Sequence, residues 1–253
     1  DGCFETLRYY SGMMLKWDDH FNRLKAGLKY LGMKPSFTSA GMQKAIHELA
    51  SINSTSDKEV MVRIQCWRSG VRGYTTDSTT VHWMVQMSEI SLQNNPMYLI
   101  TANTPCIPSR ALSRRYKLNN GLNYIKAAQE AEHKNADDAL MLTVDEVISE
   151  TTSANVFWIK EGAVFTPDEN CDLLPGVTRS IVMSICKDKN IPFEEGKYPL
   201  AEVMDAEAAF CTNSLIELRE ISALDDRTFK SSHSVFNRIG EHFEAYRREH
   251  IKK

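Results

Sequence analysis

The sequence lacks the features that mark membrane, secreted and nucleic-acid-binding proteins. No apolar run approaches the about 20 residues of a membrane-spanning helix, and we expect no signal peptide. Acidic and basic residues are interspersed, with a formal net charge of -3, so no basic stripe is available for a phosphate backbone. We therefore predict a soluble cytoplasmic protein that binds neither membranes nor nucleic acid.

Cysteines are present, but none forms the CxxC pair of a zinc or redox motif. The six lie at wide, irregular spacings: Cys3, Cys66, Cys106, Cys171, Cys186 and Cys211. With 253 residues, 42% of them hydrophobic, the chain is long enough to bury a sizeable core without disulfides. We predict reduced thiols.

Several common catalytic motifs are also missing. The chain contains no GxSxG elbow, no Walker loop, no HExxH and no GxGxxG. Its histidines form no ligand cluster, so we predict no metal site: His20, His47, His82, His133, His233, His242 and His250. Composition and spacing alone predict a globular domain and leave its function open.

Hydrophobic periodicity predicts a mixture of helices and strands. Helices are expected near 19–31, 40–50, 122–134, 181–186 and 235–247, and strands near 60–66, 79–87, 139–144, 155–159 and 208–212. Asp18 or Asp19 would cap the first helix, and Gly32 would end it. Because the elements do not follow a strict βαβ alternation, we predict an α+β fold.

Prolines and asparagines between residues 92 and 112 predict a connection with one short strand and favour a domain boundary there. We predict a smaller N-terminal domain over 1–92, a connecting segment over 93–115, and a larger C-terminal domain over 116–253. The opening residues DGCFET already have the pattern of an element interior. This pattern indicates that the N-terminal part is truncated.

Three separated groups of residues match one family in order. The first group is DGCFETLR at 1–8 with DHFNRL at 19–24. The second group is KLNN at 117–120 with QEA at 129–131 and ADDA at 136–139. The third group is VISETTSANVF at 147–157 with TP at 166–167 and LPGVTR at 174–179. Together they resemble the fold-type IV pyridoxal-phosphate enzymes, which include branched-chain and D-amino-acid aminotransferases and aminodeoxychorismate lyases. The resemblance implies two α+β domains, with pyridoxal 5'-phosphate in the cleft between them and bound by the C-terminal domain. It also implies a homodimer.

The resemblance assigns roles to individual residues. Lys117 would bind the cofactor's aldehyde covalently and then move the α-proton of the substrate. Glu150 would pair with the cofactor's ring nitrogen, and Arg23 would hold its phosphate. Taken singly, each of these residue types is more often a solvated surface residue, and only the surrounding pattern favours the functional role.

A second phosphate contact is suggested by the residues themselves. Gly176, Val177 and Thr178 open a helix, where free N–H groups and the positive helix end attract anions. Pro175 and Gly176 are equally compatible with a plain turn. The resemblance adds Ser214 as another hydroxyl on the phosphate side.

The resemblance also suggests substrate contacts. Arg72 and Tyr74 lie where the D-amino-acid and lyase branches hold a substrate carboxylate across the dimer, although a solvent-exposed turn fits equally well. Phe4 and Arg8 would line the pocket.

The branch of the family stays open. Branched-chain aminotransferases carry a GGNY run after the lysine, and its tyrosine is missing from LNNGL at 118–122. GVRGY at 70–74 and TNSL at 212–215 are similar to the lyase branch, but IELREI at 216–221 departs from it. The first hypothesis is an aminotransferase acting on an amino acid and a 2-oxo acid. The alternatives are an aminodeoxychorismate lyase and a catalytically silent relative.

Overall fold

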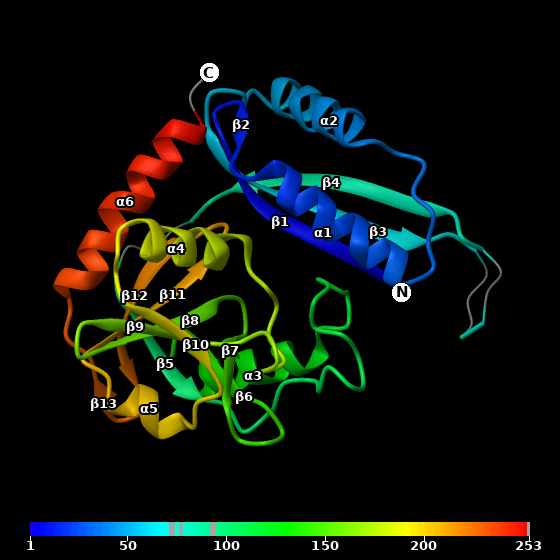
Figure 1. The fold of residues 1–253 in the computed structure, drawn as a ribbon. Coiled ribbons are helices and arrows are strands. Elements are labelled where there is room, and N and C mark those ends of the chain that lie inside the picture. Colours follow the sequence, from blue (N-terminus) through cyan, green and yellow to red (C-terminus); the bar gives the residue numbers. More distant parts are fainter. Residues whose placement is uncertain (71–73, 76–77, 92–94, 252–253) are drawn as a thin grey trace. The chain divides into compact units, whose positions relative to one another are not determined.

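A computed structural model describes residues 1–70, 74–75, 78–91 and 95–251 (Figure 1). The chain divides into two compact units. Unit 1 comprises Asp1–Ser91, Tyr116–Asn120 and Arg247–Lys253, and unit 2 comprises Leu92–Arg115 and Gly121–Tyr246. The division differs from the predicted domains in three places. The predicted connecting segment belongs to unit 2, and residues 116–120 belong to unit 1 because their backbone pairs with its first strand. Arg247–Lys253, predicted as part of the C-terminal domain, also belongs to unit 1.

Unit 1 contains an antiparallel four-stranded sheet in the order β2-β1-β3-β4. Its strands are β1 (Gly2–Tyr10), β2 (Met13–Met14), β3 (Glu59–Arg68) and β4 (Val81–Glu89). Side chains alternate between its two faces, as the period of a strand requires. One face is buried and includes Leu7, Val62 and Ile64. The predicted strands at 60–66 and 79–87 correspond to β3 and β4.

Two helices belong to unit 1: α1 (Trp17–Tyr30) lies against β1, and α2 (Ser39–Ile52) lies beside β4. Leu24 and Leu28 of α1 are fully buried. The predicted aspartate cap of α1 is wrong, because the residue preceding the helix is Lys16 in a left-handed conformation. Asp18 and Asp19 lie in the first turn instead, where their charge complements the helix dipole.

Unit 2 contains a nine-stranded sheet in the order β10-β9-β8-β11-β12-β5-β6-β7, with β13 pairing to β12. The strands are β5 (Met97–Thr101), β6 (Asp138–Leu142), β7 (Ile148–Thr151), β8 (Asn155–Lys160), β9 (Ala163–Pro167), β10 (Phe193–Gly196), β11 (Ala208–Asn213), β12 (Glu217–Leu224) and β13 (Arg227–Thr228). The pairs β5–β6, β5–β12 and β9–β10 are parallel. The sheet curls, because β7 at one edge contacts β8 and β9.

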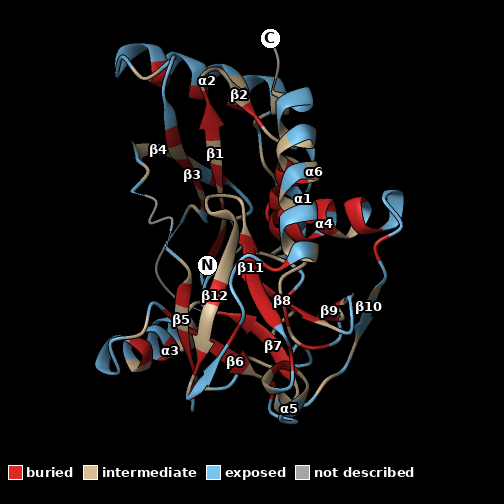
Figure 2. Ribbon diagram, turned by 90° about the vertical axis from the view of Figure 1, so that its left-hand side faces the viewer, coloured by how far each residue is buried: buried red, intermediate tan, exposed pale blue. Residues whose placement is uncertain are grey.

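The helices of unit 2 pack on this sheet. They are α3 (Leu122–His133), α4 (Val177–Asp188), α5 (Leu200–Met204) and most of α6 (Ser234–His250). Ala127 and Ala131 let α3 approach Ala139 of β6 closely. β7, β8 and β11 are buried almost throughout (Figure 2). Phe157 and Phe210 stack across β8 and β11, with ring centroids 5.0 Å apart.

The α+β prediction is confirmed, and every predicted helix and strand has a counterpart. Five strands of unit 2 had no predicted equivalent: β7, β9, β10, β12 and β13. The short strand predicted within 92–112 corresponds to β5. β7 and β10 are four residues long, too short for a period-2 pattern to stand out.

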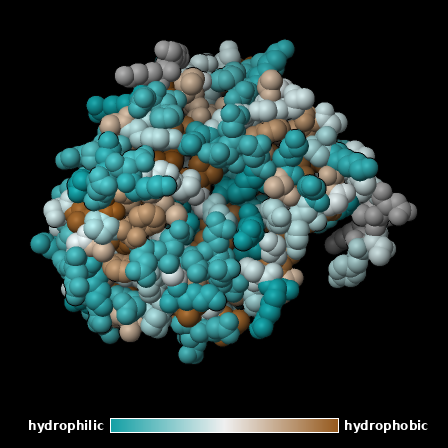
Figure 3. All heavy atoms as spheres, in the orientation of Figure 1, coloured by the Kyte–Doolittle hydropathy of each residue, from teal (hydrophilic) through white to brown (hydrophobic). Residues whose placement is uncertain are grey.

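The distribution of apolar side chains and the state of the cysteines agree with what the composition predicts. No helix among the described residues is long and apolar enough to cross a bilayer. Hydrophilic side chains cover most of the face shown in Figure 3, and apolar ones appear there in small patches. All six cysteines are buried and free, as predicted for reduced thiols.

Candidate active site

Lys117 is held against the first strand of unit 1. The Phe4 N–H donates to the Lys117 carbonyl at 2.9 Å, and the Asn119 N–H donates to the Gly2 carbonyl at 3.0 Å. Leu118 forms an isolated antiparallel bridge with Cys3. These bonds fix the backbone on both sides of the lysine. The half-buried side chain places its Nζ 4.8 Å from the centre of the Phe4 ring.

Phe4 also contacts a cation from the next strand. The guanidinium carbon of Arg63 lies 4.2 Å from the Phe4 ring centre. Arg63 stands opposite Thr6 in the β1–β3 pairing, and its burial lowers its pKa. Sequence analysis did not select Arg63. The alternation along β3 is a signal that could have found it, because it places an arginine on the same face as Phe4.

Arg23 makes a bidentate ion pair with Glu5. Its Nε and Nη2 donate to the two carboxylate oxygens at 2.7 and 2.8 Å, and His20 Nδ1 lies 2.8 Å from Glu5 Oε2. Burial would raise the pKa of Glu5, but the Arg23 charge and the hydrogen bonds from Arg23 and His20 lower it to about 2. Glu5 is another residue that sequence analysis missed. The sequence could have indicated it, because Glu5 alternates with Cys3 and Leu7 on the buried face of β1, where an acid needs a partner.

The predicted substrate residues lie in different settings. Arg8 is half-buried, forms an ion pair with Glu59, and places its guanidinium carbon 5.2 Å from the Tyr10 ring centre. Tyr74 is fully exposed. Arg72 lies outside the described residues. The substrate roles of Arg72, Tyr74, Phe4 and Arg8 stay predictions.

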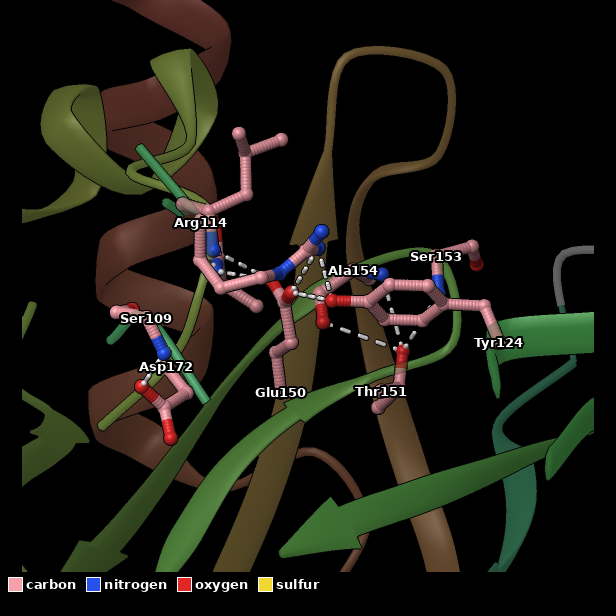
Figure 4. Close-up of polar contacts among 10 residues, drawn as sticks. Ser109, Arg114, Tyr124, Glu150, Thr151, Ser153, Ala154 and Asp172 are labelled. Atoms are coloured by element: carbon pink, nitrogen blue, oxygen red, sulfur yellow. Dashed lines mark hydrogen bonds and ion pairs between the residues drawn. The ribbon is translucent and has the colours of Figure 1, made fainter. Parts of the chain in front are cut away.

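Glu150 of β7 accepts hydrogen bonds from several side chains and from one backbone N–H group (Figure 4). The Tyr124 hydroxyl donates to its Oε1 at 2.8 Å, and Arg114 Nη2 donates to the same oxygen at 3.3 Å. Asn155 Nδ2 and the Leu174 N–H donate to Oε2 at 3.2 and 3.1 Å. All of these contacts come from donors, which suits a carboxylate acceptor.

Asn155 links Glu150 to the loop that precedes α4. Its Nδ2 also donates to the Leu174 carbonyl at 2.9 Å. Gly176 packs directly on the same amide, since a Cβ there would lie 2.1 Å from Asn155 Oδ1. The acid and the start of α4 are therefore held in one bonded arrangement.

The N-terminus of α4 suits an anion. Within the described residues, no side chain caps this helix, and its first backbone bond runs from the Ser180 N–H to the Gly176 carbonyl. The preceding N–H groups of the first turn remain available as donors, and the helix dipole adds positive potential. Val177 and Thr178 are buried here, so a bound phosphate would be partly shielded from water. Ser214 is half-buried in the turn after β11.

The predicted site residues thus form two sets. Unit 1 holds Lys117 with Phe4, and it holds Arg23 and Arg8 elsewhere on β1 and α1. Unit 2 brings together Glu150 and the α4 start, with Ser214 following β11. Their functional roles stay predictions, but a carboxylate acceptor beside an uncapped helix end fits both ends of a phosphorylated pyridine.

Comparison with known proteins defines the class. The model of the class IV amino-transferase family matches residues 2–224. Among curated relatives, D-alanine aminotransferase of Bacillus licheniformis is 26% identical over 91% of this chain and 81% of its own length. Aminodeoxychorismate lyase of Bacillus subtilis is 28% identical over 91% of this chain and 80% of its own length.

Solved structures share the fold. A putative 4-amino-4-deoxychorismate lyase of Legionella pneumophila superposes with a TM-score of 0.91 at 25% identity, covering 96% of this chain and 90% of that one. The branched-chain aminotransferase of Thermobaculum terrenum, solved in its pyridoxal-phosphate form, gives a TM-score of 0.88 at 21% identity, covering 96% and 84%. The fold is therefore that of the fold-type IV enzymes.

The chain belongs to the class IV aminotransferase family. The resemblance stated from sequence is confirmed. The family is enzymatic, its members are pyridoxal-phosphate enzymes, and the names of its relatives divide between aminotransferases and lyases. The cofactor prediction is thus confirmed at the level of the family.

Proposed function

We propose that the chain is a pyridoxal-phosphate-dependent aminotransferase that moves an amino group between an amino acid and a 2-oxo acid. The observation that carries the proposal is the bonded arrangement of Glu150, Asn155 and the uncapped α4 start. It offers an acceptor for a ring nitrogen and a cradle for a phosphate within one hydrogen-bonded arrangement of β7, β8 and the start of α4.

The residues of the chain have distinct parts in binding. Glu150 would accept the hydrogen of the ring nitrogen. The N–H groups of Val177 and Thr178, the hydroxyls of Thr178 and Ser214, and the Arg23 guanidinium would hold the phosphate. When bound, pyridoxal 5'-phosphate supplies an electron-withdrawing ring that delocalises the pair left when a Cα–H bond breaks.

Lys117 would carry the proton transfer. Its Nζ would hold the cofactor, and the same Nζ, as a free amine, would take the α-proton of the substrate and return it. The hydrogen bonds from the Phe4 N–H to the Lys117 carbonyl and from the Asn119 N–H to the Gly2 carbonyl hold the backbone around the lysine on β1, so the amine starts from a defined position. The Phe4 ring centre lies 4.8 Å from Nζ, within the range of a cation–π contact.

The second candidate is an aminodeoxychorismate lyase, which would use the same lysine to release pyruvate and 4-aminobenzoate. The similarity to the lyase of Bacillus subtilis and to the Legionella structure favours it. So does TNSL at 212–215, at the end of β11 and in the turn that follows it. In either case we expect a homodimer, which light scattering of the purified protein would measure.

The test is the visible spectrum of the purified protein with added pyridoxal phosphate, followed by panels of L- and D-amino acids. We expect an absorption band from lysine-bound cofactor, lost in Lys117→Ala and retained in the matched control Lys126→Ala, an exposed lysine of α3. Bleaching of the band by one amino acid, with formation of its 2-oxo acid, supports the aminotransferase.

Other outcomes select other functions. Release of 4-aminobenzoate from aminodeoxychorismate, with no bleaching by any amino acid, replaces the aminotransferase by the lyase. A band with neither activity indicates a silent relative. Absence of a band at saturating cofactor overturns the proposal as a whole.

A further inference from the structure

A buried arginine–tyrosine pair stands behind Glu150 (Figure 4). Arg114, from the loop before α3, donates through Nη2 to the hydroxyl oxygen of Tyr124, in the first turn of α3. Tyr124 donates in turn to Glu150 Oε1 at 2.8 Å. The guanidinium carbon of Arg114 also lies 4.6 Å from the Tyr124 ring centre. No role so far assigned to Glu150 requires either residue.

The direction of this chain of bonds is fixed by the chemistry of its members. A guanidinium only donates, and a carboxylate only accepts. The single hydroxyl hydrogen of Tyr124 must therefore point to Glu150, while its oxygen receives the Arg114 hydrogen. Burial, followed by the nearby Glu150 charge, raises the pKa of Tyr124, so the hydroxyl keeps its hydrogen. A donor polarised in this way makes a stronger bond to its acceptor.

Fold stability alone is a poor explanation for the pair. The side chains of Arg114 and Glu150 are each 7% exposed, and burying two charges has a desolvation cost that their attraction often fails to offset. Arg114 Nε is also buried without a partner among the described residues. A purely structural ion pair would be expected to satisfy every buried donor.

We propose that Arg114 and Tyr124 are positioning residues that hold the Glu150 carboxylate in one orientation and keep it an acceptor for the cofactor's ring nitrogen. Oε1 is held by this pair, and Oε2 by Asn155 and the Leu174 N–H. A ring nitrogen that meets a carboxylate surrounded by donors has to bring the bridging hydrogen itself. The pair therefore favours a protonated ring, and the inference rests on the proposed function.

The test compares proteins loaded with pyridoxal phosphate labelled with ¹⁵N in the ring. Tyr124→Phe removes only the hydroxyl, and Tyr198→Phe is the matched control because it removes another tyrosine–glutamate bond, to Glu194, in the same unit. In Tyr124→Phe we expect the ¹⁵N resonance to move toward that of the unprotonated ring. The cofactor's dissociation constant should rise about tenfold, as for loss of a hydrogen bond to a charged group. Tyr198→Phe should match the wild type in both.

Arg114 supplies an independent variant. Arg114→Gln should shift the ¹⁵N resonance in the same direction, and Arg114→Lys, which keeps the charge, should restore most of the wild-type position. A general loss of structure would appear in circular dichroism and would not be rescued in this charge-dependent way. If Tyr124→Phe and Arg114→Gln bind the cofactor with wild-type resonance and affinity, the positioning role is wrong although the cofactor assignment stands. A wild-type protein that binds no cofactor overturns both.

Discussion

Arg23 and Glu5 form a bidentate ion pair between α1 and β1, with both hydrogen bonds below 3 Å and a carboxylate that is 1% exposed. The pair places the residue predicted to hold a phosphate against an acid that was not selected from sequence. It fixes the guanidinium by its Nε and Nη2, which turns a long flexible side chain into an oriented cation.

This pair makes stability sensitive to acid. The Glu5 carboxyl titrates near 4.5 when unfolded and near 2 when folded. Its stabilising contribution is therefore complete above about pH 4.5 and is lost as the pH falls toward 2. We expect denaturant unfolding, followed by tryptophan fluorescence, to show a steep loss of stability across this window.

Replacing Glu5 should remove this pH dependence and should lower the free energy of unfolding strongly. Glu5→Gln removes the buried carboxylate that binds the half-buried Arg23 guanidinium, so we expect about 3–5 kcal/mol of destabilisation at neutral pH. The control is Glu59→Gln, which breaks the exposed ion pair with Arg8 and should cost less than about 1 kcal/mol. Equal effects from the two variants would show that the buried pair carries no special stabilisation.

Gly2 should tolerate no side chain. A Cβ there would lie 2.2 Å from the Cys66 carbonyl oxygen and 2.6 Å from Asn119 Nδ2. Gly2→Ala must separate β1 from β3 or from the segment that carries Lys117, and we expect about 1–3 kcal/mol of destabilisation in urea unfolding. Gly240→Ala, in α6 with open space around it, should instead stabilise by about 0.5–1 kcal/mol. A neutral Gly2→Ala would contradict the close approach.

Gly176 should affect the cofactor more than the fold. An added Cβ would displace Asn155 and weaken its bonds to Glu150 and to the Leu174 carbonyl. We expect Gly176→Ala to raise the dissociation constant of pyridoxal phosphate about tenfold, measured by fluorescence titration. Gly240→Ala is again the control. If Gly176→Ala binds the cofactor with unchanged affinity, the position of Asn155 does not affect cofactor binding.

The cysteines should be unreactive in the folded protein. Burial raises the pKa of Cys66 to about 12 and that of Cys186 to about 11, and the thiolate is the reactive form. An aromatic disulfide reagent at pH 8 should therefore give little reaction with the native protein and should titrate all six thiols after unfolding in guanidinium. A thiol that reacts promptly in the native state would contradict this burial.

Local pattern sufficed for most of the longer elements and for the family. The amphipathic period of α1 and the alternation of β3 are properties of short windows, so they could be predicted without a structure. The same holds for KLNN at 117–120 and LPGVTR at 174–179, whose order along the chain carried the resemblance. The cap of α1 failed, because a left-handed Lys16 starts the helix where an aspartate was expected.

Contacts between distant segments could not be predicted in this way. Arg114, Tyr124 and Asn155 meet at Glu150 only because the loop before α3, the helix itself, and the strands β7 and β8 converge in the folded unit. Glu5 likewise acquires its partners from α1. Which donors surround a buried acid depends on packing across the sheet, and one sequence contains no direct record of that packing.

The sequence by itself determined most of the longer elements and the family, because these follow from residue type and spacing, and it predicted Lys117 and Glu150 as the lysine and the acid of the chemistry. The tertiary structure alone decided that Lys117 is anchored on β1 and that Glu150 is held by an arginine–tyrosine pair. The physical reason is that hydrogen bonds and charge pairs act over a few ångströms, and only folding brings their partners within that range.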